Sequence, residues 1–203
     1  AYANVVAVSV KNPRQFSTDE RTERDYRPDC RDSPMVLITQ ETPADQQAVD
    51  AVHRAAFPTD DEATLVDALR DTDVFDPSLS LVALDDQGDV VGHVLCTPVT
   101  VDNDPSIRAL TLAPIAVRPE RQGEGIGSSL VEAALDAAAE AGFGLVFLHG
   151  DPEFYSRFGF HPAGIRGFEN PFETPPEAFM VATIGDDPEA GGPLSYPAPF
   201  DDL

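Results

Sequence analysis

Three glycines lie at alternate positions, Gly123, Gly125 and Gly127, between an apolar run and a stretch with helical periodicity. A helix N-terminus leaves its first N–H groups without partners and carries a partial positive charge, so it attracts anions. Glycine also lets the main chain approach a phosphate closely. The segment 122–127 therefore predicts a phosphate cradle made of main-chain N–H groups.

Two better-known anion motifs do not fit this loop. A P-loop ends in Gly-Lys-Ser/Thr, whereas the only lysine of the chain is Lys11; a dinucleotide loop reads G-x-G-x-x-G, whereas this one reads G-x-G-x-G. The glycines alone are equally consistent with a flexible turn. Arg118 and Arg121 favour the anion site, because they are two of only seven cationic side chains in residues 35–203.

Two further segments carry related patterns. Upstream, residues 112–117 read LAPIAV, and downstream, residues 154–160 read FYSRFGF, in which Tyr155 lies four residues before Gly159-Phe160. With Gln122-x-x-Gly125-x-Gly127, which fits Q/R-x-x-G-x-G/A, these segments resemble the GNAT superfamily of N-acetyltransferases. The resemblance is strongest to its YhbS-like branch of small bacterial and archaeal acetyltransferases. It covers roughly residues 35–200 and is most specific over 112–160.

This resemblance implies an acetyl-CoA-dependent N-acetyltransferase with the GNAT fold, a mixed central β-sheet flanked by helices (α/β, α+β). It implies that main-chain groups along one strand pair with the pantetheine arm, and that the glycine loop and the next residue hold the pyrophosphate. The cofactor-binding residues would then be Ile115, Ala116, Val117, Gln122, Gly123, Glu124, Gly125, Ile126, Gly127 and Ser128. No metal is implied.

Catalysis needs an acid and a base. The resemblance assigns the acid to Tyr155, which would protonate the departing CoA thiolate. The strand 109–117 has no acidic residue to deprotonate the amine. His149, six residues before Tyr155, is the preferred side-chain base, while His53, His93, Glu153 or a water held by carbonyl groups remain alternatives. A CoA-binding regulatory module without transfer activity is the alternative function.

The hydrophobic pattern predicts the elements that position these residues. The expected helices begin at Thr42-Pro43 and, through a capping box, at Thr59 with Glu62. The other expected elements are strands 36–38, 81–84, 90–99, 109–117, 145–148 and 178–184, helices 126–141 and 151–158, and an irregular tail from Asp186. The pattern predicts a mixed sheet with helices on its faces.

The 203-residue chain carries 36 acidic and 13 basic side chains, a net charge of −23. Such a surface repels nucleic acid and anionic membranes, because phosphate contacts need Lys and Arg. It could attract a cationic amine. Acidic, lysine-poor surfaces suit a salt-rich cytoplasm, where ions screen self-repulsion. We therefore expect a cytoplasmic protein from a halophile, monomeric or homodimeric, with partners limited to acetyl-CoA and the amine.

Charge also divides the chain. Residues 1–34 contain six basic and six acidic side chains, so the whole net charge lies in 35–203. We expect 1–34 to be an N-terminal extension with a composition that allows disorder, and 35–203 to be the acetyltransferase domain. Cys30 and Cys96 have no metal-ligand spacing, and Cys96, within an apolar strand, is expected to be a buried hydrophobe.

Overall fold

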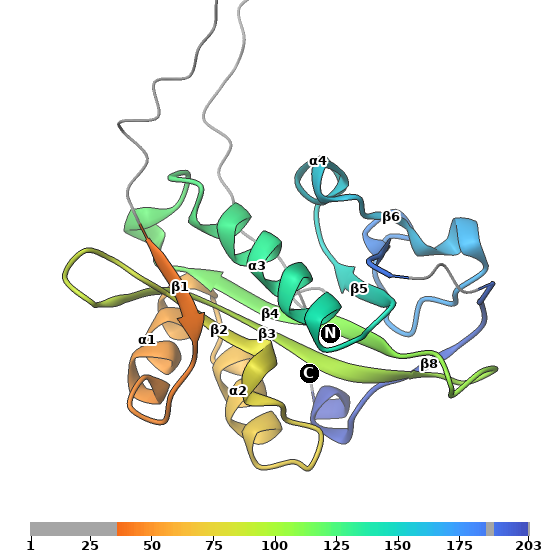
Figure 1. Cartoon of the computed structure of the whole chain (residues 1–203), viewed down its shortest axis with the longest axis horizontal. Coiled ribbons are helices and arrows are strands. Elements are labelled where there is room, and N and C mark those ends of the chain that lie inside the picture. Colours follow the sequence, from red (N-terminus) through yellow and green to blue (C-terminus); the bar gives the residue numbers. More distant parts are fainter. Residues whose placement is uncertain (1–35, 186–188, 203) are drawn as a thin grey trace, which may run out of the picture.

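The computed structural model describes residues 36–185 and 189–202, which build a sheet with helices on both faces (Figure 1). The strand order is β1-β2-β3-β4-β5-β7-β6, with β8 paired to β3. The elements are β1 (Leu37–Gln40), α1 (Gln46–Ala56), α2 (Asp61–Arg70), β2 (Ser80–Leu84), β3 (Val90–Val101), β4 (Ala109–Val117), α3 (Ile126–Glu140), β5 (Leu145–His149), α4 (Pro152–Tyr155), β6 (His161–Pro162), β7 (Phe179–Thr183) and β8 (Leu194–Ser195).

The two faces of the sheet have separate cores. Helix α3 packs on one face through an apolar stripe that includes Ile126, Leu130 and Ala134. Helices α1 and α2 pack on the other face around Val52 and Leu65. Every residue of β4 is buried, because this central strand is covered on both sides. The predicted mixed sheet with flanking helices is confirmed.

Both predicted helix starts on the α1–α2 side are wrong. Helix α1 begins at Gln46, because the Thr42 N–H and hydroxyl donate to the Asp45 carboxylate and close a turn ahead of the helix. The capping box expected at Thr59 does not form. The Thr59 hydroxyl donates to the Asp61 side chain instead. Asp60, at the N-cap position of α2, makes no capping hydrogen bond with its side chain.

The C-terminal part is more ordered than expected for an irregular tail. Residues 194–195 form β8, residues 198–202 form a 3-10 helix, and Phe200 is buried in the α1–α2 core. The remaining predicted strands and α3 are confirmed within a few residues, and the predicted helix 151–158 is α4 followed by a 3-10 turn. The expectations for residues 1–34, including Cys30, lie outside the described residues. Across the described ranges, no helix is long and apolar enough to span a membrane.

Candidate active site

The central feature of the site is a break between two parallel strands. The β4–β5 ladder joins only Ala109–Thr111 to Leu145–Phe147, although β4 runs on to Val117 and β5 to His149. Between Leu112 and Ile115, β4 has one more residue than the facing part of β3, which is a β-bulge. Bulges bend a strand away from its neighbour. The β5-facing edge of residues 112–117 therefore has no strand partner among the described residues.

The glycine loop lies where β4 ends and α3 begins. Gly123 and Gly125 have φ values of 84° and 91°, in the region that favours glycine. A Cβ added to either glycine would meet no atom within 4 Å, so the loop surface is open there. Gly125 provides no side-chain cap for α3, and the first turn has no acidic residue. The N–H groups at this end of α3 therefore have no side-chain cap, which is compatible with the anion site expected from the sequence.

Tyr155 lies at the same break. Its ring is fully buried and packs against Gly150, the residue after β5, so closely that a Cβ there would lie 2.2 Å from the ring. The hydroxyl is buried and has no hydrogen-bond partner in the described structure. Burial, and secondarily the charge of Asp151, raises the pKa of Tyr155. The phenol therefore keeps its proton at neutral pH.

His149, the last residue of β5, is held tightly. Its Nε2 donates to Asn170 Oδ1 at 3.0 Å, since the Asn170 amide donates to the Thr174 carbonyl and so presents its oxygen. The ring stacks on Phe179 and meets the edge of Phe172. Burial lowers the pKa of His149, while the bond to Asn170 opposes that shift. The ring is therefore neutral, with an unprotonated Nδ1.

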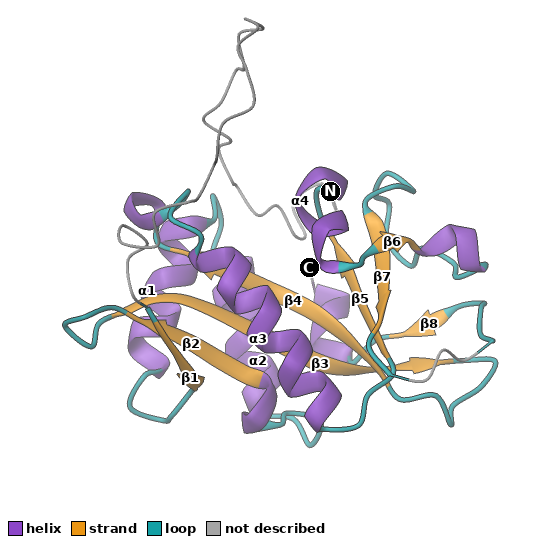
Figure 2. Cartoon of the chain, turned by 45° about the horizontal axis from the view of Figure 1, so that its top comes forward, coloured by secondary structure: helices purple, strands orange, loops and turns teal. Residues whose placement is uncertain are grey.

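Tyr155 and His149 lie on opposite faces of the sheet at this break. Along β5, Val146 and Leu148 face the α3 core, which also contains Tyr155. Phe147 and His149 point the other way, because side chains alternate along a strand. Figure 2 shows α3 and α4 on the same side of the sheet. An acid on one face and a base on the other would flank a group held in the gap.

The two arginines singled out from the sequence are engaged by the protein itself. Arg121 Nε donates to Glu124 at 2.7 Å, and its Nη1 lies 3.6 Å from Asp85. Arg118 Nε donates to the Val90 carbonyl at 2.8 Å. The sequence reasoning missed Arg157, whose Nη2 donates to the Ser128 hydroxyl in the first turn of α3. Its position, two residues after Tyr155, was the available signal.

A buried polar network, which we call the Glu41 network, was also missed. Ser80 donates to Glu41 and accepts from His93 Nε2, and His93 Nδ1 accepts from His53 Nε2 at 2.8 Å. Arg70 pairs with the other Glu41 oxygen at 2.5 Å. The network lies between the sheet and α1, and His53 Nδ1 at its end has no described partner. The five residues of the network come from five separate segments of the chain, so no local sequence motif predicts it.

The electrostatics of the Glu41 network follow from its burial and pairing. Burial alone would raise the pKa of Glu41, but hydrogen bonds from His93 and Ser80 and the charge of Arg70 lower it to about 2. Burial lowers the pKa of both His53 and His93. The network therefore contains a carboxylate, a guanidinium and two neutral imidazoles. In the core on the other face, around α3, burial raises the pKa of Cys96 to about 12, as expected for a buried thiol without a chemical role.

This arrangement defines a class of protein: a mixed sheet in which two parallel strands separate beside the N-terminus of a helix. Comparison with known sequences identifies the family. The sequence profile of the Acetyltransferase (GNAT) family matches residues 47–160. The chain belongs to this family.

Two curated relatives from Escherichia coli K12 are similar. The uncharacterized N-acetyltransferase YhbS is 38% identical over 152 residues, which cover 75% of this chain and 89% of YhbS. The uncharacterized N-acetyltransferase YjhQ is 35% identical over 136 residues, which cover 66% of this chain and 75% of YjhQ. The predicted resemblance to the YhbS-like branch is thus confirmed.

Solved structures agree with the sequence comparison. The E. coli YhbS structure in complex with CoA has a TM-score of 0.77 and 33% identity, covering 90% of this chain and 96% of that one. A GNAT acetyltransferase from Brucella melitensis in complex with acetyl-CoA has a TM-score of 0.66 and 32% identity, covering 82% and 99%. The present chain therefore has the GNAT fold.

Proposed function

We propose that this protein is an acetyl-CoA-dependent N-acetyltransferase that transfers an acetyl group to a primary amine of a small molecule or peptide. The observation that carries this proposal is the buried Tyr155 hydroxyl, unpartnered among the described residues, beside the break between β4 and β5. A buried hydroxyl without a partner is unfavourable unless something else bonds it. A thioester sulfur held in the break would fill that role.

The cofactor fits the groups that surround the break. The free edge of β4 at Ile115, Ala116 and Val117 would pair with the pantetheine amides as an added strand would. The N–H groups of residues 123–127, together with Ser128, would hold the diphosphate at the N-terminus of α3, with the Gln122 N–H joining them if it leaves the Pro119 carbonyl. Two similar proteins were crystallised with CoA or acetyl-CoA, which supports this placement.

The chain would then supply two proton transfers. The amine nitrogen forms a bond to the acetyl carbon, and the carbon–sulfur bond breaks. Tyr155 gives its hydroxyl proton to the leaving sulfur, which its raised pKa allows because the phenol is still protonated at neutral pH. His149 Nδ1 would accept the proton that the amine loses, from the opposite face.

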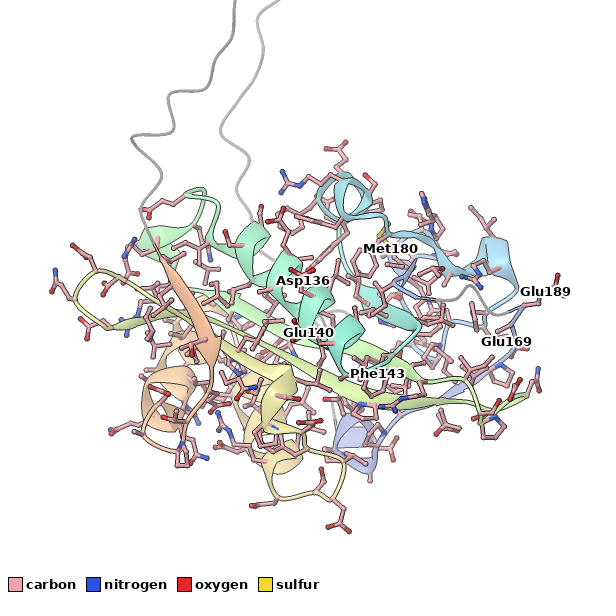
Figure 3. The ribbon with its side chains drawn as sticks, viewed as in Figure 1. Asp136, Glu140, Phe143, Glu169, Met180 and Glu189 are labelled. Atoms are coloured by element: carbon pink, nitrogen blue, oxygen red, sulfur yellow. The ribbon has the colours of Figure 1, made fainter. Side chains whose placement is uncertain are left out.

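The surface charge bears on two questions: which kind of amine the protein would attract, and at which salt concentration it would work. Helix α3 exposes Glu132, Asp136 and Glu140 at successive turns, and Figure 3 shows the latter two on its outer side. A net charge of −23 would attract a cationic amine, and added salt would screen both that attraction and self-repulsion. We therefore place the enzyme in a salt-rich setting, and its melting temperature should rise as KCl is added.

The decisive experiment measures thiol release from acetyl-CoA by the full chain with a panel of amines. The panel should include polyamines, amino sugars, amino-acid amides and short peptides with free N-termini. Amine-dependent release of free CoA, with an acetylated product seen by mass spectrometry, would support the proposal. Tight CoA binding without release for any amine would support the non-catalytic binding module instead.

A further inference from the structure

Arg157 is an exposed cation in an acidic chain, and several contacts hold its guanidinium in one place. It follows α4, is exposed, and its guanidinium stacks 4.4 Å from the ring centre of Phe154 and 5.1 Å from that of Phe158. Its Nε donates to the Phe154 carbonyl, and its Nη2 donates to the Ser128 hydroxyl at 3.2 Å. These contacts fix the plane of the guanidinium over the first turn of α3.

The bond between Arg157 and Ser128 crosses the break. Ser128 belongs to the helix that follows β4, whereas Arg157 belongs to the turn that follows β5. Phe154 supports the same crossing, because its ring lies 3.8 Å from the place a Cβ of Gly127 would take. A ligand lying along the free edge of β4 toward the N-terminus of α3 would therefore pass next to the guanidinium.

The local charge balance singles out Arg157. Arg118 and Arg121, the two arginines of the loop, are accompanied by three carboxylates within 4 Å, those of Asp85, Glu120 and Glu124. Arg157 has no carboxylate within salt-bridge distance among the described residues. Without Arg157 the surroundings of the loop are net negative, which would repel a diphosphate. The cradle of N–H groups alone offers only partial charges.

We propose that Arg157 is a cofactor-binding residue whose guanidinium binds the diphosphate of acetyl-CoA, together with the N–H groups of residues 123–127. The inference rests on the proposed function, since it assumes that this site takes acetyl-CoA. On binding, Arg157 exchanges its hydrogen bond to the neutral Ser128 hydroxyl for one to a phosphate oxygen. Charge-assisted bonds of this kind are about twice as strong as neutral ones. The cation also joins the β4 and β5 sides around the bound molecule.

The test is calorimetric titration of the full chain with CoA and with 3′-dephospho-CoA, which keeps the diphosphate and lacks the other phosphate. Arg157→Gln should raise the Kd of both ligands by the same factor, about tenfold, as expected for losing one charged hydrogen bond. Arg157→Lys should retain part of the affinity, because it keeps the charge. Arg54→Gln, which removes a cation from α1 with the same change in net charge, should leave both Kd values within about twofold.

Three outcomes would overturn the inference. An unchanged Kd in Arg157→Gln removes Arg157 from the site. A loss for CoA alone assigns Arg157 to the 3′-phosphate instead of the diphosphate. Equal losses in Arg157→Gln and Arg157→Lys, with a lowered melting temperature in both, mean that the arginine acts through packing on Phe154 and Phe158. Failure of the wild-type chain to bind either ligand would count against the proposed function itself.

Discussion

The two faces of the sheet differ in the kind of chemical group that they carry near the break between β4 and β5. On the α3 face, which we call the cofactor face, the site is built from main-chain N–H groups, glycines and one buried phenol. On the α1–α2 face, which we call the acceptor face after the proposed function, the groups are buried polar side chains. His149 with Asn170 lies at the end of β5, and the Glu41 network lies between β2, β3 and the helices. A main-chain site needs only local sequence, whereas a side-chain network needs distant segments brought together.

The comparison also concerns stability. The core of the cofactor face is apolar, and no ion pair lies within it among residues 36–185 and 189–202. The acceptor face buries the charges of Glu41 and Arg70, whose side chains are 4% and 8% exposed. A buried pair contributes little by itself, but removing one partner leaves the other charge uncompensated. Substitutions on the cofactor face should therefore mainly weaken ligand binding. Substitutions on the acceptor face should mainly lower the stability of the fold.

The largest effect is expected from Glu41→Ala. It leaves Arg70 buried and removes the acceptor of Ser80, so the free energy of unfolding should fall by about 3–5 kcal/mol. Asp67→Ala is the matched control, because Asp67 also pairs with Arg70 at 2.5 Å but its side chain is 61% exposed. It should cost less than about 1 kcal/mol. Similar losses in urea denaturation of the two variants would refute the asymmetry between the faces.

Tyr155→Phe should affect turnover and leave the fold intact. The hydroxyl makes no described hydrogen bond, so its removal leaves no protein group unsatisfied. We expect kcat to fall about 100-fold, the lower range for losing a general acid, while the Kd for CoA stays within about twofold. Tyr196→Phe removes an equally buried hydroxyl on the C-terminal segment and should keep its kcat. Unaltered turnover in Tyr155→Phe would exclude the phenol from the mechanism.

Gly125→Val tests the main-chain cradle. A branched side chain would project into the open space at the N-terminus of α3, and the Kd for CoA should rise at least about tenfold. Gly88→Val separates binding from backbone strain, because Gly88 has a φ of 85°, also has no atom near its Cβ position and lies in the β2–β3 turn. Both variants should lose similar melting temperature, but only Gly125→Val should lose affinity. Equal affinities would mean that the phosphate binds elsewhere.

The smallest effect per residue is a loss of stability in mild acid. His53, His93 and His149 have pKa values lowered by burial, so the unfolded chain binds protons that the folded chain does not. Stability should therefore fall as pH drops below the unfolded value near 6.5, by no more than roughly 0.7 kcal/mol for each histidine between pH 7 and 6. Urea denaturation at pH 7 and at pH 6 measures this change in the free energy of unfolding. The control His161→Gln, which removes an exposed histidine, should show the same fall.

Glu41 adds a second phase at lower pH. Its folded pKa of about 2 lies below the ordinary carboxyl value, so it stabilises the protein above pH 4.5 and loses that contribution as pH falls toward 2. Glu41→Ala should reduce this second phase, to which Asp85 and Asp104 also contribute through their lowered pKa values, and leave the first. A single transition with the same pH dependence in both proteins would show that the carboxylate is not held in its charged form by the network.

The difference between the faces explains what the sequence could predict. The order of strands, α3 and the open glycine loop followed from local patterns, because periodicity, glycine and helix-end chemistry act over a few residues. Tyr155 was found from its spacing to Gly159, although its unpartnered hydroxyl was not foreseeable. The roles assigned to Tyr155, His149 and the cofactor-binding residues remain predictions until variants are measured.

The failures have a common cause in polar side chains with several possible partners. Thr42 and Thr59 were read as helix caps, but each bonds an aspartate side chain two or three residues away. Arg118 and Arg121 were taken as support for an anion site, but both already have partners within the protein. Arg121 pairs with Asp85 and Glu124, and Arg118 donates to the Val90 carbonyl. His93 was considered only as an alternative base, and Glu41 and Ser80 carried no signal. The meeting of these three residues depends on the pairing of β2 with β3.

The segment after residue 163 gives the fold a modular character. It supplies Asn170 behind His149, a strand along β3 and the Phe200 ring in the α1–α2 core, whereas the glycine loop and Tyr155 lie earlier in the chain. Under the proposed function, the groups that bind the acetyl donor and those beside the amine would thus be encoded in largely separate stretches. Exchanging this later stretch between family members should then change which amine is accepted while the affinity for CoA stays unaltered.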